Sequence, residues 1–68
     1  MTANEPPGET CWVEAWLTAK GRRWRASVID TATGETLFVT PDTYTTRLYA
    51  VAAARQWAQE HAMIEVDQ

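Results

Sequence analysis

Cysteine and histidine are scarce in this sequence, with one of each in 68 residues, Cys11 and His61. A single cysteine excludes an internal disulfide, and one cysteine with one histidine argues against a zinc site built from protein ligands alone. Long apolar runs are also lacking, since no segment approaches the roughly 20 residues that span a bilayer. The first ten residues have neither the basic nor the apolar region of a signal peptide. We therefore expect a cytoplasmic protein that does not contact a membrane.

Basic residues are few as well: six lysines and arginines stand against nine acidic residues, for a net charge of -3. The chain is also short, and a domain of this size buries only about 60% of its unfolded surface. Small domains gain stability from disulfides, metals or oligomerisation. With the first two argued against, we expect a homodimer.

The amino-terminal segment, residues 1–10, has almost no apolar surface to bury and is predicted to be a disordered leader. A single domain is predicted over residues 11–63. Residues 64–68 alternate weakly in polarity, and they are either a tail or a short extra strand.

Within this domain, β-branched and aromatic residues predict three strands, at residues 11–18, 24–30 and 36–40. Gly21 and Gly34 lie in the two short turns between them, so the strands form an antiparallel meander. An alanine-rich segment without glycine or proline predicts a helix from Arg47 to about Ala62, capped by Thr45 or Thr46. The expected fold is α+β, a three-stranded antiparallel meander with one C-terminal helix packed on one face (β-β-β-α).

Side chains alternate across a strand, so each strand has a helix-facing side and an open side. Mostly small apolar residues are predicted to face the helix: Val13, Ala15, Leu17, Trp24, Ala26, Val28, Leu37 and Val39. The helix is expected to meet them with Ala50, Val51, Ala54, Trp57, Ala58 and Ala62. Large apolar residues are predicted on the open side: Trp12, Trp16, Ile29 and Phe38. We interpret these four as a protein interface, for a second copy of the chain or for an unidentified protein.

Two segments, WRASVIDTATGETLF and DTYTTRLYAVAAARQWA, resemble one repeat of the bacterial YegP-like domain family of unknown function. The residues that carry this resemblance are Trp24, Arg25, Gly34, Glu35, Tyr44, Thr45, Thr46, Arg47 and Ala50. The resemblance implies three strands and a helix, often present as a tandem pair or a two-fold dimer, and no known active site.

A weaker resemblance is to the arm-site-binding domain of tyrosine recombinases, which is also a three-stranded sheet with a C-terminal helix. It draws attention to the stretch KGRRWR, residues 20–25, which holds four of the six basic residues. As an alternative function, a nucleic-acid-binding accessory protein would use Lys20, Arg22, Arg23 and Arg25 to contact phosphates. The pI near 4.9 argues against it. The competing interpretation is a solvated turn whose arginines pair with Glu14 or Glu35 across the sheet.

Catalysis has little support in the sequence. Cys11 is expected to be a small buried hydrophobe, and His61 is expected to interact with the last carbonyls of the helix. Glycine-rich phosphate loops, paired carboxylates and metal-binding spacings do not occur. We expect a protein that is not an enzyme and needs neither a metal nor a cofactor.

Overall fold

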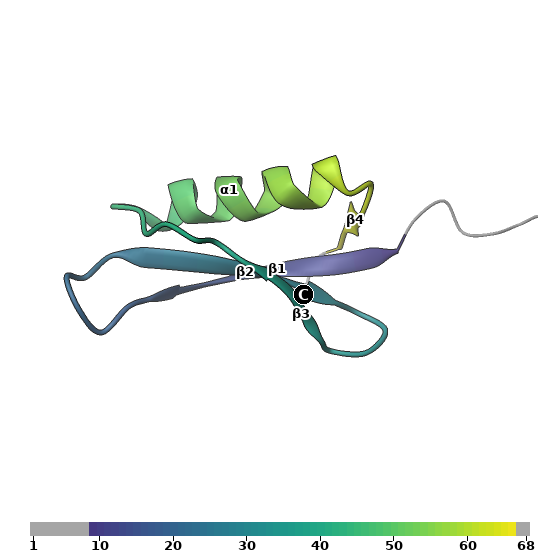
Figure 1. The fold of residues 1–68 in the computed structure, drawn as a ribbon, viewed down its shortest axis with the longest axis horizontal. Helices are drawn as coiled ribbons and strands as arrows, with labels where there is room; N and C mark the ends of the chain where they lie inside the picture. Colours follow the sequence, from purple (N-terminus) through teal and green to yellow (C-terminus); the bar gives the residue numbers. More distant parts are fainter. Residues whose placement is uncertain (1–8, 67–68) are drawn as a thin grey trace, which may run out of the picture.

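The computed structural model describes residues 9–66, which form one layer of β-sheet and one layer of helix. The elements follow one another along the chain as β1 (Thr10–Leu17), β2 (Trp24–Asp30), β3 (Thr36–Val39), α1 (Arg47–Glu60) and β4 (Ile64–Glu65). Helix α1 lies along one face of the twisted sheet (Figure 1), where it packs mainly on β2 and β1. The α+β class and the packing of the helix on the sheet are therefore confirmed.

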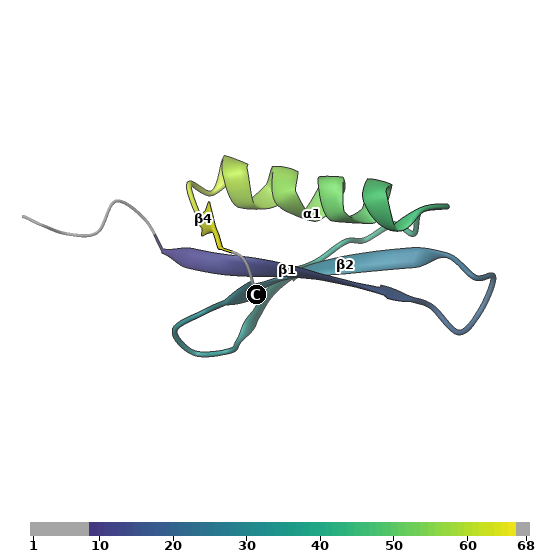
Figure 2. The same cartoon turned by 180° about the vertical axis from the view of Figure 1, so that it is seen from behind.

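The sheet differs from the predicted meander by one strand. Within residues 9–66 it has four strands in the order β3-β2-β1-β4. Strand β4 runs parallel to β1, with Thr10 beside Ile64 and Cys11 beside Glu65. Figure 2 shows β4 next to β1, below the C-terminal end of the helix. The prediction of three strands, all antiparallel, was therefore wrong. For residues 64–68 we considered a tail or a short extra strand, and Ile64–Glu65 form a short strand.

The leader predicted for residues 1–10 falls mostly on residues 1–8, which lie outside the described residues. At its end, Thr10 already belongs to β1, and the Glu9 carbonyl accepts a hydrogen bond from the Ile64 amide at 2.9 Å. This part of the prediction was wrong because the backbone of both polar residues has a partner, the Glu9 carbonyl on the β4 side and the Thr10 carbonyl with the Thr31 amide at 3.2 Å.

Strands β1 and β2 form the hairpin that the sequence predicts. Val13 pairs with Val28 and Ala15 with Ala26, so the helix-facing sides of the two strands agree with the alternation pattern. Gly21 takes φ 73° in the connecting turn, a backbone conformation that glycine adopts without steric cost.

The core lies between the sheet and α1 and is built from small side chains. Its fully buried members are Cys11, Ala26, Val28, Ala50, Ala54 and Ala58. Alanine on the helix lets its axis come close to the sheet, as the sequence predicts. Leu17 is an exception among the predicted core residues, because it lies at the end of β1 and is 47% exposed.

Both ends of α1 are capped by local hydrogen bonds. The Thr46 hydroxyl accepts from the Tyr49 amide at 3.1 Å, which selects Thr46 over Thr45 as the N-cap. At the other end the Met63 amide donates to the Ala58 carbonyl at 2.9 Å, and the Ala62 amide donates to the Gln59 carbonyl at 3.1 Å. This pattern is a Schellman motif, with Ala62 in the left-handed conformation at φ 57°. The prediction that the helix reaches about Ala62 was therefore wrong. The helix ends at Glu60, because the motif turns the chain back towards β1.

None of the helices within the described part of the chain is long and apolar enough to cross a membrane.

Candidate interaction surface

The open face of the sheet, opposite α1, has the side chains of β1 and β2 in register. Trp12 pairs with Ile29, Glu14 with Ser27 and Trp16 with Arg25. Strand β3 adds Thr36 beside Ile29 and Val39 beside Ser27. We use the name open face for these eight residues.

Burial on the open face is uneven. The residues in the middle of the face are buried, since Ile29 is 7% exposed and Ser27 is 4% exposed. Large apolar surface is exposed on the strands that flank β2 instead, with Trp16 at 39% on β1 and Val39 at 41% on β3. The exposed apolar area is therefore smaller than the sequence predicted, and Trp16 is more exposed than the half-buried Trp12.

The polar residues of the open face are held by neighbours. The Trp12 indole donates from Nε1 to Oε2 of Glu14 at 2.9 Å. The Arg25 guanidinium donates to the Thr40 carbonyl at 3.0 Å. Each charged group retains further hydrogen-bonding capacity, because a guanidinium has five donors and a carboxylate about four acceptor sites.

Phe38 does not lie on the open face, contrary to the prediction. It pairs with Val28, whose side chain faces the helix, and the register between β2 and β3 shifts between Val28 and Ile29. This β-bulge places one extra residue in β3 and reverses the alternation counted from the sequence. Val39, predicted to face the helix, points to the open face for the same reason.

Three rings stack beside the core, between β3 and the end of α1. Phe38 stacks on Trp57 with ring centroids 5.0 Å apart and planes at 10°. His61 also stacks on Trp57, with ring centroids 3.9 Å apart and planes at 20°. The His61 ring also lies against the helix end, with Nδ1 donating to the Trp57 carbonyl at 2.9 Å. The expected interaction of His61 with a terminal carbonyl is thereby confirmed.

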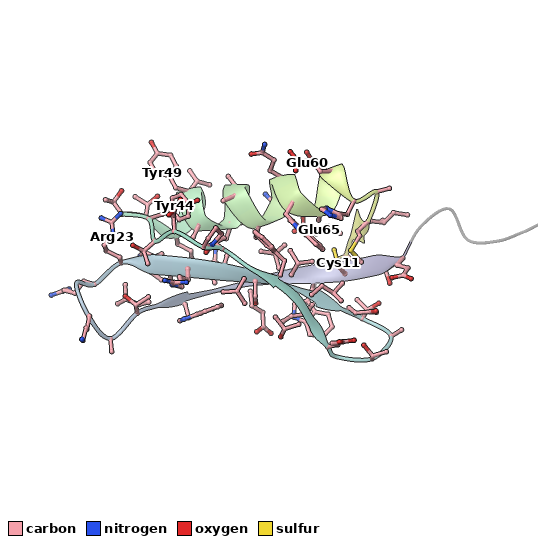
Figure 3. The ribbon with its side chains drawn as sticks, in the orientation of Figure 1. Cys11, Arg23, Tyr44, Tyr49, Glu60 and Glu65 are labelled. Carbon is pink, nitrogen blue, oxygen red and sulfur yellow. The ribbon has the colours of Figure 1, made fainter. Side chains whose placement is uncertain are left out.

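The basic cluster at residues 20–25 is divided by its contacts. Arg23 donates from Nε to the Thr43 hydroxyl at 2.7 Å and from its terminal nitrogen to the Thr43 carbonyl at 2.8 Å. Figure 3 shows Arg23 near Tyr44, at the segment that enters the helix. Arg25 bonds to Thr40, as described above, so these two arginines hold the sheet to that segment. Lys20 and Arg22 are exposed at the hairpin tip. The acidic partners expected across the sheet, Glu14 and Glu35, do not pair with Arg23 or Arg25 in the described hydrogen bonds.

Cys11 lies beneath the end of the helix and is fully buried, as the sequence predicts (Figure 3). Burial raises the pKa of its thiol, and the nearby carboxylates of Glu65 and Asp30 raise it further. A buried thiol with a raised pKa is a poor nucleophile.

Strand β4 is joined to the helix by an ion pair that the sequence analysis missed. The Arg55 guanidinium donates to both oxygens of Glu65, at 2.5 and 2.8 Å. This hydrogen bond raises the pKa of Arg55 and lowers the pKa of Glu65. The two side chains are 45% and 30% exposed. Ten residues and a helix end separate the pair, so helical spacing gives no signal for it.

Within residues 9–66, no three histidine, cysteine or acidic residues lie close enough to hold a metal ion. No family model matches the chain, and no curated protein or solved structure matches it either. The resemblances noted from the sequence therefore stay predictions, and function has to be argued from the surface itself.

Proposed function

We propose that this protein is a small non-catalytic interaction module that forms a homodimer through the open face, with Trp16 in the contact. The observation that carries this proposal is the exposure of Trp16, 39% on the face that α1 leaves uncovered. Tryptophan is among the residues enriched at protein interfaces, where it anchors binding.

Burial of the exposed part of Trp16 would contribute measurably to the free energy of dimerisation. An exposed fraction of 39% corresponds to about 100 Å² of a tryptophan's surface of roughly 250 Å². Burial of that area is worth about 2.5 kcal/mol in each copy. Because a two-fold dimer contains the residue twice, this amounts to about 5 kcal/mol per dimer, so its loss weakens association by roughly a thousandfold or more.

The electrostatics of the open face are compatible with a second copy. The face carries one acid, Glu14, and one base, Arg25, so two such faces do not repel each other as two like-charged surfaces would. A domain of 68 residues buries little surface by itself, and pairing with a second copy of the chain would bury more.

Catalysis and nucleic-acid binding are less well supported. The one thiol is buried, and the one imidazole is stacked on Trp57 and bonded to a carbonyl. Of the four cations proposed for phosphate contacts, Arg23 and Arg25 are engaged within the fold. Even with all four cations free to contact phosphates, so few contacts on a chain of net charge -3 give weak binding.

Sedimentation equilibrium of the Trp16→Glu variant tests the proposal. We expect the unmodified chain to be a dimer at high micromolar concentration and Trp16→Glu to be a folded monomer. Tyr49→Glu is the matched control, because Tyr49 is 59% exposed on the helix and points away from the sheet (Figure 3), and it should remain a dimer. An unmodified chain that is monomeric at this concentration refutes self-association. Dimerisation of Trp16→Glu as strong as that of the unmodified chain refutes the role of Trp16.

A further inference from the structure

The backbone hydrogen bonds show which residues of β1 face the edge of the strand that lies away from β2. The carbonyls of Glu9 and Cys11 accept bonds from β4, whereas the Thr10 carbonyl and the Thr18 amide bond to the segments flanking β2. Backbone groups alternate along a strand, so odd-numbered residues of β1 direct their amides and carbonyls away from β2.

Strand β4 covers only the beginning of this edge. Within residues 9–66 it pairs with Thr10 and Cys11, and its last bond runs from the Val66 amide to the Cys11 carbonyl. Val13, Ala15 and Leu17 therefore direct their backbone groups to an edge that the described part of β4 does not reach. Such an edge is a template for pairing with another strand.

Exposed apolar side chains gather along the same edge. Trp16 and Leu17 are 39% and 47% exposed at the end of β1. Leu48, 69% exposed, precedes Arg55 by seven residues and so lies on the same flank of the helix. Arg55 bonds to Glu65 of β4, which shows that this flank overlooks the β1–β4 side of the sheet.

We propose that β1 of one copy pairs antiparallel with β1 of a second copy about a two-fold axis at Ala15, so that two four-stranded sheets become one. This inference rests on the self-association proposed above and narrows its geometry: the copies meet along the β1 edge of the open face, where Trp16 lies, and not across the whole face. Ala15 lies opposite Ala15 of the second copy, and Val13 lies opposite Leu17 of the second copy. Each such pair exchanges two backbone hydrogen bonds, so the seam contains about six.

This register fits the rest of the fold. The second copy's β1 ends at Leu17, opposite Val13. The last described bond of the C-terminal segment runs from the Val66 amide to the Cys11 carbonyl, so Val66 and the second copy's Leu17 meet end to end along the edge. On the face of the sheet that carries the helices, Val13 of each copy packs against Leu17 of the other. On the other side, the two Trp16 rings are diagonal neighbours, within reach of aromatic contact.

The spacing of the helices also agrees. Adjacent strands lie about 4.8 Å apart, and α1 packs over β2 and β1. Four consecutive strands, β2-β1-β1-β2, therefore place the two helix axes roughly 10 Å apart, near the 8–10 Å at which helices pack. Leu48, on the flank described above, then faces the second copy's helix.

Charge complementarity accounts for the basic hairpin tip in an acidic chain. In this register the turn that follows Leu17 of one copy approaches the start of β1 in the other. Lys20 and Arg22 are exposed in that turn, and Glu9 is exposed just before β1, where its carbonyl bonds to the Ile64 amide of β4. We therefore expect Arg22→Glu to weaken the dimer roughly fivefold, and Glu9→Arg in the same chain to restore it.

Amide hydrogen exchange followed against protein concentration tests the seam directly. The amides of Ala15 and Leu17 should be protected at concentrations where the protein is a dimer and should exchange rapidly on dilution. The Trp16 amide, directed to β2, is the internal control and should be protected throughout. A dimer in which Ala15 and Leu17 exchange rapidly overturns the inference. So does protection that is unchanged on dilution, because the edge would then be covered within one copy.

Two variants separate this seam from face-to-face stacking. Ala15→Pro removes an amide proton from the outer edge, where proline is tolerated, and should weaken the dimer roughly 30-fold. Val39→Glu alters the far side of the open face and should leave it unchanged. If Val39→Glu loses the dimer and Ala15→Pro retains it, the edge seam is wrong, but self-association stands. A monomeric unmodified chain refutes both. If circular dichroism shows that Ala15→Pro is unfolded, the hydrogen-exchange experiment on the unmodified chain decides whether the edge seam forms.

Discussion

Replacement of Ala62 by glycine is expected to stabilise the protein, although it removes a side chain. Ala62 follows the helix at φ 57°, in the left-handed region where an L side chain collides with its own backbone. The residue is exposed, so the loss of its methyl group leaves no cavity. Glycine is the usual residue at this position of a Schellman motif.

The size of the effect is the difference between two terms. Relief of the left-handed conformation contributes about 1–2 kcal/mol. The greater freedom of glycine in the unfolded chain removes about 0.4–1 kcal/mol. The net gain is about 0.5–1 kcal/mol, which corresponds to a rise in Tm of roughly 2–8 °C for a domain of this size.

Urea unfolding followed by tryptophan fluorescence measures this gain, with Ala52→Gly as the matched control. Ala52 is exposed within the helix, and the same substitution there should cost about 1 kcal/mol. The two variants should therefore shift the unfolding midpoint in opposite directions. If Ala62→Gly instead destabilises the protein as Ala52→Gly does, the left-handed helix end is wrong.

Three further changes test the contacts around the helix. Thr46→Ala should lower the free energy of unfolding by about 1 kcal/mol, because it removes the N-cap bond to the Tyr49 amide; urea titration should show no comparable loss for Thr45→Ala. Because the folded pKa of Glu65 is lowered by its bond to Arg55, the stabilisation is present above the unfolded pKa of about 4.3 and is lost as pH falls through the folded pKa. Glu65→Gln should thus be about 0.2–1 kcal/mol less stable at neutral pH for this exposed pair, and a gap that persists in acid would contradict the ion pair. Cys11 should react with a thiol reagent far more slowly in the folded protein than in urea, and equal rates would show that it is accessible.

Alternation along β1 and β2 was sufficient to predict which residues face the helix. These strands are long, and their helix-facing residues are apolar and mostly small, so one phase of the alternation is clearly favoured. Strand β3 has four residues, with Leu37, Phe38 and Val39 all apolar, so neither phase is favoured. The bulge that decides between them depends on pairing with β2, which the sequence of β3 alone does not encode.

The contacts that tie the sheet to the helix were out of reach of the sequence for a related reason. Arg23 and Thr43 are 20 residues apart, and Arg55 and Glu65 are ten apart across a helix end. A cluster of basic residues in a sequence shows where charge is concentrated but not which side chains are already bound. In the structure, Arg23 and Arg25 bond to Thr43 and Thr40, whereas Lys20 and Arg22 lie exposed at the tip of the hairpin.

Sedimentation equilibrium of the unmodified chain over a wide range of concentration tests the central claim most directly. The chain has a mass of 7.7 kDa. We expect the apparent mass to rise to twice that value at high micromolar concentration and to stop there, because a two-fold seam closes on itself. A mass that stays at the monomer value over the whole range would contradict self-association, and a mass that continues to rise beyond the dimer would contradict the closed seam.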